Sequence, residues 1–255
     1  MAVPRTITLG DVEVPRIGLG TNRLAHTAEN VELIQEGVAA GLRHIDTAHT
    51  YARGQSEETI GEALALHHDG TVVATKGGWD SGRPEAIREQ IEESLRRLEV
   101  EAIDLYYFHR PDPETPLEAS LGPIKEAVDA GSIRHVGLSS VSIEQLERGR
   151  SVVPVTAVQN HFNLSERGSE DVVDYCEREG IVFVPFFPLR GDGGLELDEI
   201  AERRGYSPVQ ITLAWLLHRS PVMLPIPGTL SLEHLRENLD ALDIELSDAE
   251  FDALR

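Results

Sequence analysis

The sequence predicts one α/β domain, a (β/α)8 TIM barrel spanning residues 1–255, and three observations favour it. Short apolar runs rich in β-branched residues alternate along the chain with stretches of helical periodicity. Several runs are too continuously apolar for a sheet with one face in water, which indicates parallel strands covered on both faces. The length of 255 residues is typical of this barrel, and no Pro/Ser-rich linker divides the chain.

Eight runs are expected to form the strands. In chain order they are Arg16–Gly20, Arg43–Asp46, Thr71–Lys76, Ile103–His109, Ile133–Ser139, Val155–Gln159, Ile181–Pro185 and Val222–Ile226. A doubly wound open sheet is the competing fold class. Its Gly-x-Gly-x-x-Gly signature is missing, because the nearest match, Gly18–Arg23, lacks the third glycine.

Three segments between these runs show clear helical spacing. Pro84–Leu98 places its apolar residues on one stripe and begins with a proline, which suits a first helical turn. Glu170–Glu179 follows Ser169, a residue type that caps helices, and ends at Gly180. Leu117–Ala130 contains Gly122-Pro123, which should kink or restart the helix.

The chain is strongly acidic, with 23 Lys+Arg against 44 Asp+Glu and a formal net charge of −21. This charge argues against non-specific nucleic-acid binding, because phosphate attraction requires a basic surface. Only two lysines occur, Lys76 and Lys125, so arginine supplies nearly all the positive charge. The composition resembles that of a salt-adapted cytoplasmic protein, whose self-repulsion salt would screen. An ordinary acidic protein with a biased composition is the alternative.

A single cysteine, Cys176, excludes an intrachain disulfide and a cysteine-rich metal site. The first ten residues lack the apolar core of a signal peptide, and no stretch approaches the ~18 apolar residues of a membrane span. We therefore expect a soluble cytoplasmic protein without a membrane partner. A barrel of this size completes its own core, which favours a monomer.

Polar side chains occur where the predicted strands end. They are Asp46, Lys76, His109, Ser139, Ser140 and Gln159, with Tyr51 just beyond the second strand. In this barrel the carboxyl ends of the strands face the active-site mouth, so these side chains should converge. Each has an ordinary structural interpretation as a turn cap or a satisfied core residue. Lys76 is the exception, because an ammonium at the end of an apolar strand requires a partner or loses its proton.

Four segments carry a family resemblance. Gly41–Tyr51 with Gly54–Glu57, Asp104–Asp112, Gly131–Ser139, and Ile226–Thr229 with His234–Asn238 resemble, in family order, the signatures of the aldo-keto reductase superfamily. The resemblance implies reduction of a small-molecule carbonyl by hydride from a nicotinamide. It implies Tyr51 as general acid, Lys76 as the group that lowers the pKa of Tyr51, and Asp46 as the anchor of Lys76. His109 would polarise the carbonyl in its neutral form.

The resemblance also implies the cofactor contacts. They are Gly20, Thr21, Asp46, Ser139, Ser140, Gln159, Phe186, Phe187, Pro188, Leu189, Gly191, Ile226, Gly228, Thr229, His234, Glu237 and Asn238. Four positions depart from many relatives: Ser140 replaces Asn, Phe186 a stacking Tyr, Gly228 a phosphate-pairing Lys, and His234 an Arg. Phe186 and Phe187 could instead be core residues. NADP(H) is favoured as the cofactor, with NAD(H) possible.

The substrate itself is not predicted. Asn22, Arg23, His49, Trp79, Phe162 and Arg190 are the expected pocket residues, and Val184–Leu189 resembles a subgroup that includes pyridoxal reductases. Three alternatives are a Schiff-base aldolase using Lys76, a metal hydrolase using Asp46, His49, His109 and His161, and a cofactor-binding regulatory or sensor protein with little turnover. No His-x-His or Glu-x-x-His pair supports the metal, so none is predicted.

Overall fold

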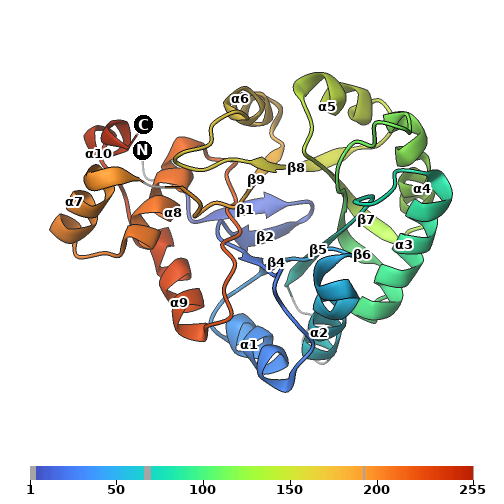
Figure 1. The fold of residues 1–255 in the computed structure, drawn as a ribbon, viewed down its shortest axis with the longest axis horizontal. Coiled ribbons are helices and arrows are strands. Elements are labelled where there is room, and N and C mark those ends of the chain that lie inside the picture. Colours follow the sequence, from blue (N-terminus) through green and yellow to red (C-terminus); the bar gives the residue numbers. More distant parts are fainter. Residues whose placement is uncertain (1–3, 66–69, 192, 255) are drawn as a thin grey trace.

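The strands of the protein form a curled parallel sheet. The structure is a computed structural model that describes residues 4–65, 70–191 and 193–254. Within these ranges seven parallel strands pair in chain order, and helices surround them (Figure 1). The strands are β3 (Leu19–Gly20), β4 (His44–Asp46), β5 (Val72–Gly77), β6 (Ile103–Phe108), β7 (Ile133–Ser139), β8 (Val155–His161) and β9 (Val182–Phe186). Each observed strand overlaps the run expected for it, with ends shifted by a few residues.

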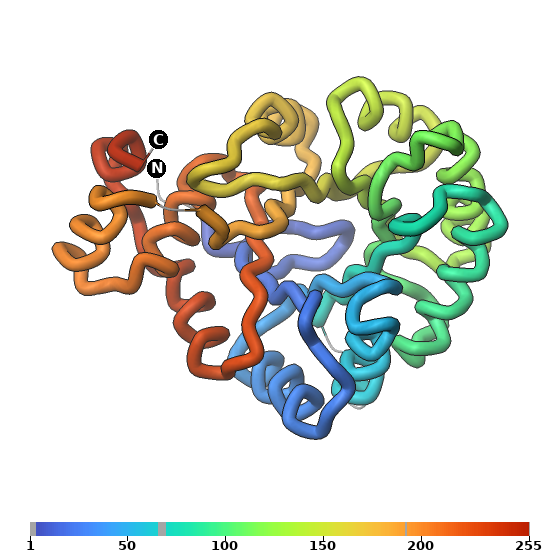
Figure 2. The backbone as a smooth tube through the Cα atoms, viewed as in Figure 1, coloured from blue at the N-terminus to red at the C-terminus, as the bar shows by residue number. Residues whose placement is uncertain are grey.

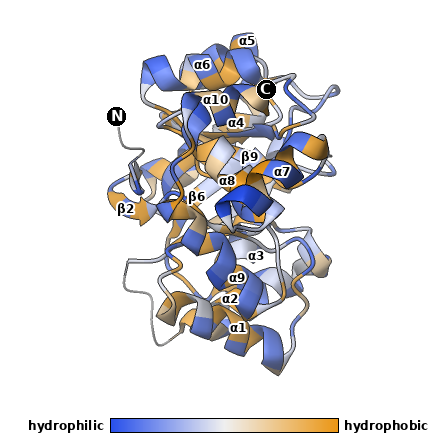
Figure 3. Cartoon of the chain, turned by 90° about the vertical axis from the view of Figure 1, so that its left-hand side faces the viewer, coloured by the Kyte–Doolittle hydropathy of each residue, from blue (hydrophilic) through white to orange (hydrophobic). Residues whose placement is uncertain are grey.

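Helices follow the strands and form the outer layer, as the backbone trace shows (Figure 2). They are α1 (Ala28–Ala39), α2 (Gln55–Leu64), α3 (Pro84–Leu98), α4 (Leu117–Asp129), α5 (Ile143–Arg150), α6 (Glu170–Glu179), α7 (Gly194–Arg204), α8 (Pro208–Arg219), α9 (Leu232–Asp240) and α10 (Asp248–Ala253), with 3-10 turns η1 (Tyr51–Gly54) and η2 (Ala241–Asp243). Hydrophilic and hydrophobic residues alternate along α1 and α7 (Figure 3), as expected for helices with one buried face.

The eighth expected strand, Val222–Ile226, is not a regular strand. Met223 forms an isolated bridge with Phe183, and Gly228, two residues beyond the expected run, forms one with Gly20. Pro225 and Pro227 have no N–H to donate, so a continuous ladder cannot form there. Their carbonyl oxygens still accept hydrogen bonds from β3 and the residues before it, at 3.0 and 3.3 Å. This closing segment completes the barrel, and the predicted (β/α)8 fold class is confirmed.

An N-terminal hairpin of β1 (Thr6–Leu9) and β2 (Val12–Pro15) precedes the barrel and has no counterpart among the eight expected strands. Its Leu9 and Val14 are buried against side chains from the barrel interior, including Tyr107. Figure 1 shows the hairpin at the centre of the ring of strands. The hairpin therefore fills one end of the barrel with apolar side chains, and the open end is the one where the strands terminate.

Two of the three predicted helices have the expected bounds, and the third differs inside the helix. α3 and α6 have the predicted bounds, and Gly180 ends α6 in the left-handed conformation. Ser169 stands at the predicted cap position of α6, but its side chain makes no capping hydrogen bond. The expectation for α4 is a kink or a restart at Gly122-Pro123; the helix runs as one element from Leu117 to Asp129, so the restart is wrong and the helix tolerates one missing hydrogen bond.

Candidate active site

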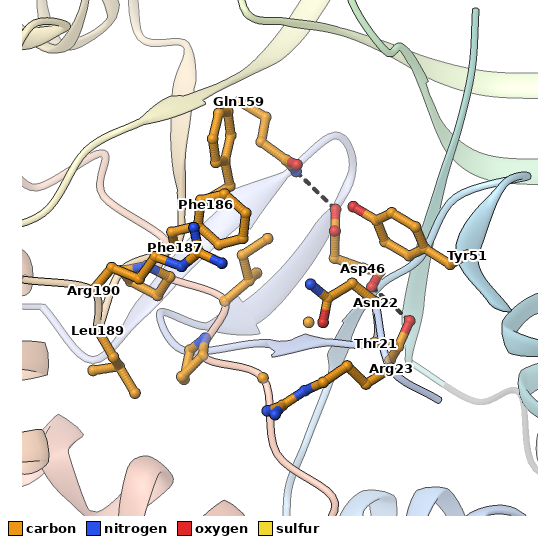
Figure 4. Close-up of a pocket in the computed structure, with 15 residues that line it drawn as sticks. Thr21, Asn22, Arg23, Asp46, Tyr51, Gln159, Phe186, Phe187, Leu189 and Arg190 are labelled. Carbon is orange, nitrogen blue, oxygen red and sulfur yellow. Dashed lines mark hydrogen bonds between the residues drawn. The ribbon is translucent and has the colours of Figure 1, made fainter. Parts of the chain in front are cut away.

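A wholly buried ion pair lies inside the barrel, at the ends of β4 and β5. The Lys76 Nζ donates to Asp46 Oδ1 at 2.5 Å and to the Thr47 carbonyl oxygen at 2.7 Å, and the Lys76 side chain has 0% exposure. The second Asp46 oxygen accepts a hydrogen bond from Gln159 Nε2 at 2.7 Å (Figure 4). Parallel pairing explains the convergence, because the strands bring their carboxyl ends to the same edge of the sheet.

Tyr51 lies directly beside this ion pair. The Lys76 ammonium is 5.0 Å from the centre of the Tyr51 ring, and Tyr51 lines the cavity at the open end of the barrel. Ala52, Arg53 and Gly54 follow with φ of 48°, 59° and 91°. Three successive left-handed residues turn the chain sharply from Tyr51 into α2. Such strained backbone clusters at functional sites.

His109 follows β6 and faces the same cavity. Its ring meets the Tyr51 ring edge-on at 6.0 Å and the Trp79 ring at 4.8 Å. Its Nδ1 is buried and has no hydrogen-bond partner among the described residues. The four titratable residues among those predicted to converge are therefore together in the structure: Asp46, Tyr51, Lys76 and His109.

Burial controls the protonation of this group. Burial lowers the pKa of His109 to about 3, with further lowering from Lys76 and Arg110, so the imidazole is neutral at physiological pH. Burial opposes the charge of Lys76, but Asp46 and Tyr51 together outweigh it and raise the Lys76 pKa. Lys76 is thus a protonated, enclosed ammonium, which does not suit a Schiff-base nucleophile.

The predicted lowering of the Tyr51 pKa is wrong for this structure. Burial of the phenol raises the pKa of Tyr51, and the charge of Lys76 lowers it by a smaller amount. The expectation considered the ammonium alone and omitted the desolvation of the phenolate. Tyr51 consequently holds its proton at neutral pH, as a proton donor must before reaction.

Three adjoining cavities form one cleft across the open end of the barrel. The inner cavity, about 380 Å³, contains Tyr51 and His109; the central cavity, about 310 Å³, shares Tyr51, Gln159 and Phe186 with it. The outer cavity, about 480 Å³, shares Arg23, Leu189 and Gly228 with the central one. A continuous cleft of this extent is long enough for a ligand with several chemical parts.

Most of the predicted cofactor residues line this cleft. They are Gly20, Thr21, Asp46, Ser139, Ser140, Gln159, Phe186, Phe187, Pro188, Leu189, Ile226, Gly228, Thr229, His234, Glu237 and Asn238. Phe186 and Phe187 form a wall opposite Asp46 and Tyr51 (Figure 4), which rules out the core interpretation of these phenylalanines. Gly191 is not among the lining residues and packs near Ser165.

The predicted substrate residues divide into two groups. Asn22, Arg23, Trp79 and Arg190 line the cleft, as expected. His49 and Phe162 do not. His49 turns to α3 and pairs with Glu93 at 2.6 Å, whereas Phe162 is fully buried. Phe162 stacks on Trp215 at 6.0 Å, because the residue lies beyond the end of β8 on the side of the helical layer.

Sequence reasoning missed two features of the site. Thr50 and Arg110 line the inner cavity, and both directly adjoin predicted residues, Tyr51 and His109, which was the available signal. The second feature is a network behind Tyr51 in which Arg97 donates to the His49 carbonyl oxygen and to the buried Glu57. No sequence signal could find this network, because α2 and α3 meet only in the folded chain.

The proposed metal alternative has no matching cluster. Among residues 4–65, 70–191 and 193–254, no group of three His, Cys, Asp or Glu side chains could hold an ion. His49 is paired with Glu93, and His161 stacks on Phe186 at 5.2 Å. None of the helices within the same ranges is long and apolar enough to cross a membrane.

A family model described as "Aldo/keto reductase family" matches residues 16–196 and 192–255 of the chain. The chain belongs to the aldo-keto reductase family. This confirms the predicted resemblance. This chain is 38% identical to an uncharacterized oxidoreductase of Schizosaccharomyces pombe, and the match covers 96% of this chain and 87% of that protein. It is 34% identical to pyridoxine 4-dehydrogenase of Escherichia coli, with 95% and 94% covered.

Solved structures agree with the family assignment. An aldo/keto reductase from Klebsiella pneumoniae in complex with NADP and acetate has a TM-score of 0.89, 32% identity, and 99% and 94% coverage of the two chains. The thermostable aldo-keto reductase Tm1743 in complex with epalrestat has a TM-score of 0.91, 33% identity and 98% coverage of both chains. This chain therefore shares its fold with an aldo/keto reductase whose solved structure contains NADP.

Proposed function

We propose that this aldo-keto reductase reduces an aldehyde or ketone to an alcohol, with NADPH preferred and Tyr51 as the proton donor. The bound nicotinamide would supply a hydride to the carbonyl carbon. The observation that carries the proposal is the meeting of Tyr51 and neutral His109 in the inner cavity, beside the buried pair of Lys76 and Asp46.

The residues of the cleft fit a nicotinamide dinucleotide. A Cβ on Gly20 would lie 2.7 Å from the Ile226 carbonyl oxygen, so the floor of the cleft requires glycine there. Gln159 and Ser139 would hold the carboxamide, and Phe186 offers a flat face to the ring. Arg23 and Arg190 line the central cavity, where their positive charges would meet the diphosphate.

The outer cavity suits the adenosine half of the cofactor. Ser231 caps α9 by accepting a hydrogen bond from the His234 backbone N–H, so the positive end of the helix dipole faces this cavity. Thr229, Ser231 and His234 would contact a 2′-phosphate, since Gly228 has no side chain to do so. These contacts favour NADPH. NADH remains the alternative cofactor, because no lysine or arginine lies at position 228 or 234.

The protein side chains would divide the chemistry between them. Tyr51 would give its proton to the carbonyl oxygen as negative charge develops there. The Lys76 ammonium would stabilise the resulting phenolate, and Asp46 holds that ammonium in place through its 2.5 Å hydrogen bond. His109 would orient the carbonyl oxygen from the other side, and its lowered pKa keeps it neutral for this role.

The test of the proposal is to follow nicotinamide absorbance with aldehydes and ketones, pyridoxal among them, using NADPH and NADH at low and high salt. We expect consumption of NADPH that depends on the carbonyl. Cofactor binding without turnover on any carbonyl would favour the regulatory or sensor alternative instead. Three properties stay predictions: the monomeric state, the cytoplasmic location and the single domain over residues 1–255. Light scattering of the purified protein tests the monomeric state.

The sharpest variant is Tyr51→Phe, which removes the donated proton and leaves the ring. We expect kcat to fall by about 10²–10⁴-fold, the contribution of a positioned acid. Cofactor affinity, measured by quenching of protein fluorescence, should change little because the ring remains. Activity close to wild type would disprove the assignment of Tyr51 as the acid.

A further inference from the structure

Arg110 stands at the entrance of the inner cavity in a fixed orientation. Its Nε donates to the Trp79 carbonyl oxygen at 2.8 Å. Its guanidinium carbon lies 4.5 Å from the centre of the Trp79 ring, a cation–π contact. The hydrogen bond uses only the inner nitrogen, Nε. Among the described residues, the two terminal nitrogens, which make the fork that binds carboxylates and phosphates, take part in no hydrogen bond or ion pair.

The charge balance of the inner cavity is opposite to that of the whole protein. The chain has 44 acidic and 23 basic residues, yet no aspartate or glutamate is among the described residues that line this cavity. Arg110 is the permanently charged side chain of that lining. The remaining polar residues are neutral: Asn22, Thr50, Tyr51, His109, Ser139, Ser140 and Gln159.

The charge of the nearby Arg110 makes the smallest of the contributions that lower the pKa of Asp112. The Asp112 carboxylate accepts hydrogen bonds from the backbone N–H groups of Gly82 at 2.7 Å and Glu114 at 2.9 Å, and these lower its pKa. Among the described residues, no ion pair within 4.0 Å joins Arg110 to a carboxylate. The Trp79 ring is 44% exposed, and an exposed aromatic ring beside a guanidinium without an ion pair makes a recognition site for a ligand with a matching anion.

We propose that the inner cavity selects carbonyl substrates that carry an anionic group, a carboxylate or phosphate, bound by Arg110. The proposal rests on the proposed carbonyl reduction and names its substrate class. The Trp79 ring contacts both His109 and Arg110. A substrate carbonyl at His109 and a substrate anion at Arg110 would therefore lie about one indole width apart. The preferred substrate therefore bears its carbonyl and its anion at opposite ends of a flat or extended body.

Two aldehydes of similar size and shape, one anionic and one neutral, test the preference for an anionic substrate. 4-Formylbenzoate and its neutral analogue 4-formylbenzamide are compared by kcat/KM in the holoenzyme, with wild type and Arg110→Gln. The ratio of the two values is expected to fall about tenfold in the variant, mainly through the KM of the carboxylate. Differences in the reactivity of the aldehydes cancel when ratios are compared between proteins.

Two further variants separate local binding from net charge. Arg110→Lys should keep part of the preference, since a point charge replaces a fork. Arg178→Gln removes the same charge from the exposed face of α6 and should leave the ratio unchanged. Raising KCl should lower the wild-type ratio, because an exposed guanidinium is screened by salt.

A binding measurement distinguishes failure of this inference from failure of the proposed reduction. Calorimetry of terephthalate with the cofactor-loaded protein should show binding about tenfold weaker in Arg110→Gln than in wild type. If 4-formylbenzamide is reduced but the ratio and the terephthalate affinity do not respond to Arg110→Gln, the anionic preference is wrong and the reductase stands. If neither these aldehydes nor any other carbonyl of the panel is reduced, the proposed reduction is wrong, and terephthalate binding alone decides whether Arg110 is an anion site.

Discussion

The two lysines of this protein show how differently one residue type acts in two environments. Lys76 and Asp46 form a pair with 0% and 2% exposed side chains, whereas Lys125 and Asp129 are 50% and 64% exposed. Moving charges out of water costs free energy that the buried pair only partly recovers. Lys76 is therefore held inside the barrel at a cost to stability. The proposed stabilisation of the Tyr51 phenolate by the Lys76 ammonium accounts for this cost.

Asp46→Asn should lower the free energy of unfolding by about 3–5 kcal/mol, because it leaves the Lys76 charge buried and uncompensated. Asp129→Asn is the matched control and should cost much less, since water replaces the lost partner. Urea denaturation at pH 7 measures both. Equal losses in the two variants would contradict the structural difference between the pairs.

Acid sensitivity is expected from the buried His44. Burial lowers its pKa to about 4, against about 6.5 in the unfolded chain. Between these values the unfolded chain binds a proton that the folded one does not, so stability falls as pH drops through this window. His44→Gln should remove about 2 kcal/mol of the stability difference between pH 7 and pH 4.5, measured by denaturation at both pH values. His26→Gln, on the surface, is the control and should retain the full pH dependence.

At the scale of elements, α3 supports the turn that carries Tyr51. Arg97 on α3 donates to the His49 carbonyl oxygen at 3.1 Å and to Glu57 at 3.3 Å. Glu57, on α2, also accepts from Thr75, the neighbour of Lys76, at 2.5 Å. The network thus connects the segment before Tyr51, the helix after it and the strand that holds Lys76.

Arg97→Gln should lower kcat about tenfold while cofactor affinity changes little, because a small displacement of Tyr51 would weaken the proposed proton transfer. Steady-state kinetics and fluorescence titration measure the two quantities. Arg97→Lys should restore part of kcat by keeping the charge beside Glu57. Arg96→Gln, exposed on the same helix, is the control. A uniform loss in all three variants would mean that α3 contributes only general stability.

The elements that could be predicted are those whose signals are local. α3 and α6 were predicted to the residue, because an apolar stripe, Pro84 and Gly180 mark them within the sequence. The convergence of Asp46, Lys76 and His109 followed from strand order alone. His49 and Phe162 were placed wrongly, and the Tyr51 pKa had the wrong direction, since these depend on which helix packs nearby and how deeply the ring is buried.

At the scale of the whole molecule, the net charge of −21 predicts a dependence on salt. Self-repulsion opposes the compact state, and about 0.1 M salt shortens its range to about 10 Å. We expect Tm to rise by about 5 °C between 0.05 and 2 M KCl, measured by calorimetry. An unchanged Tm would favour the alternative of an ordinary acidic protein.

A variant with fewer charges is the matched control. Asp198, Glu199 and Glu202 are exposed on α7, and changing them to the amides Asn, Gln and Gln removes three negative charges from one face. The salt dependence of this variant should be weaker than that of wild type. A dependence as steep as before would attribute the effect to ion-specific hydration and not to repulsion.

Because Pro225 and Pro227 have no N–H, few backbone hydrogen bonds close the barrel between Gly20 and Gly228. Both glycines line the central cavity. A ligand bound in the central cavity would contact both sides of this gap and add interactions that the backbone cannot make. Ligand binding and thermal stability are then linked by mass action, so Tm should rise with the concentration of a ligand that occupies the central cavity.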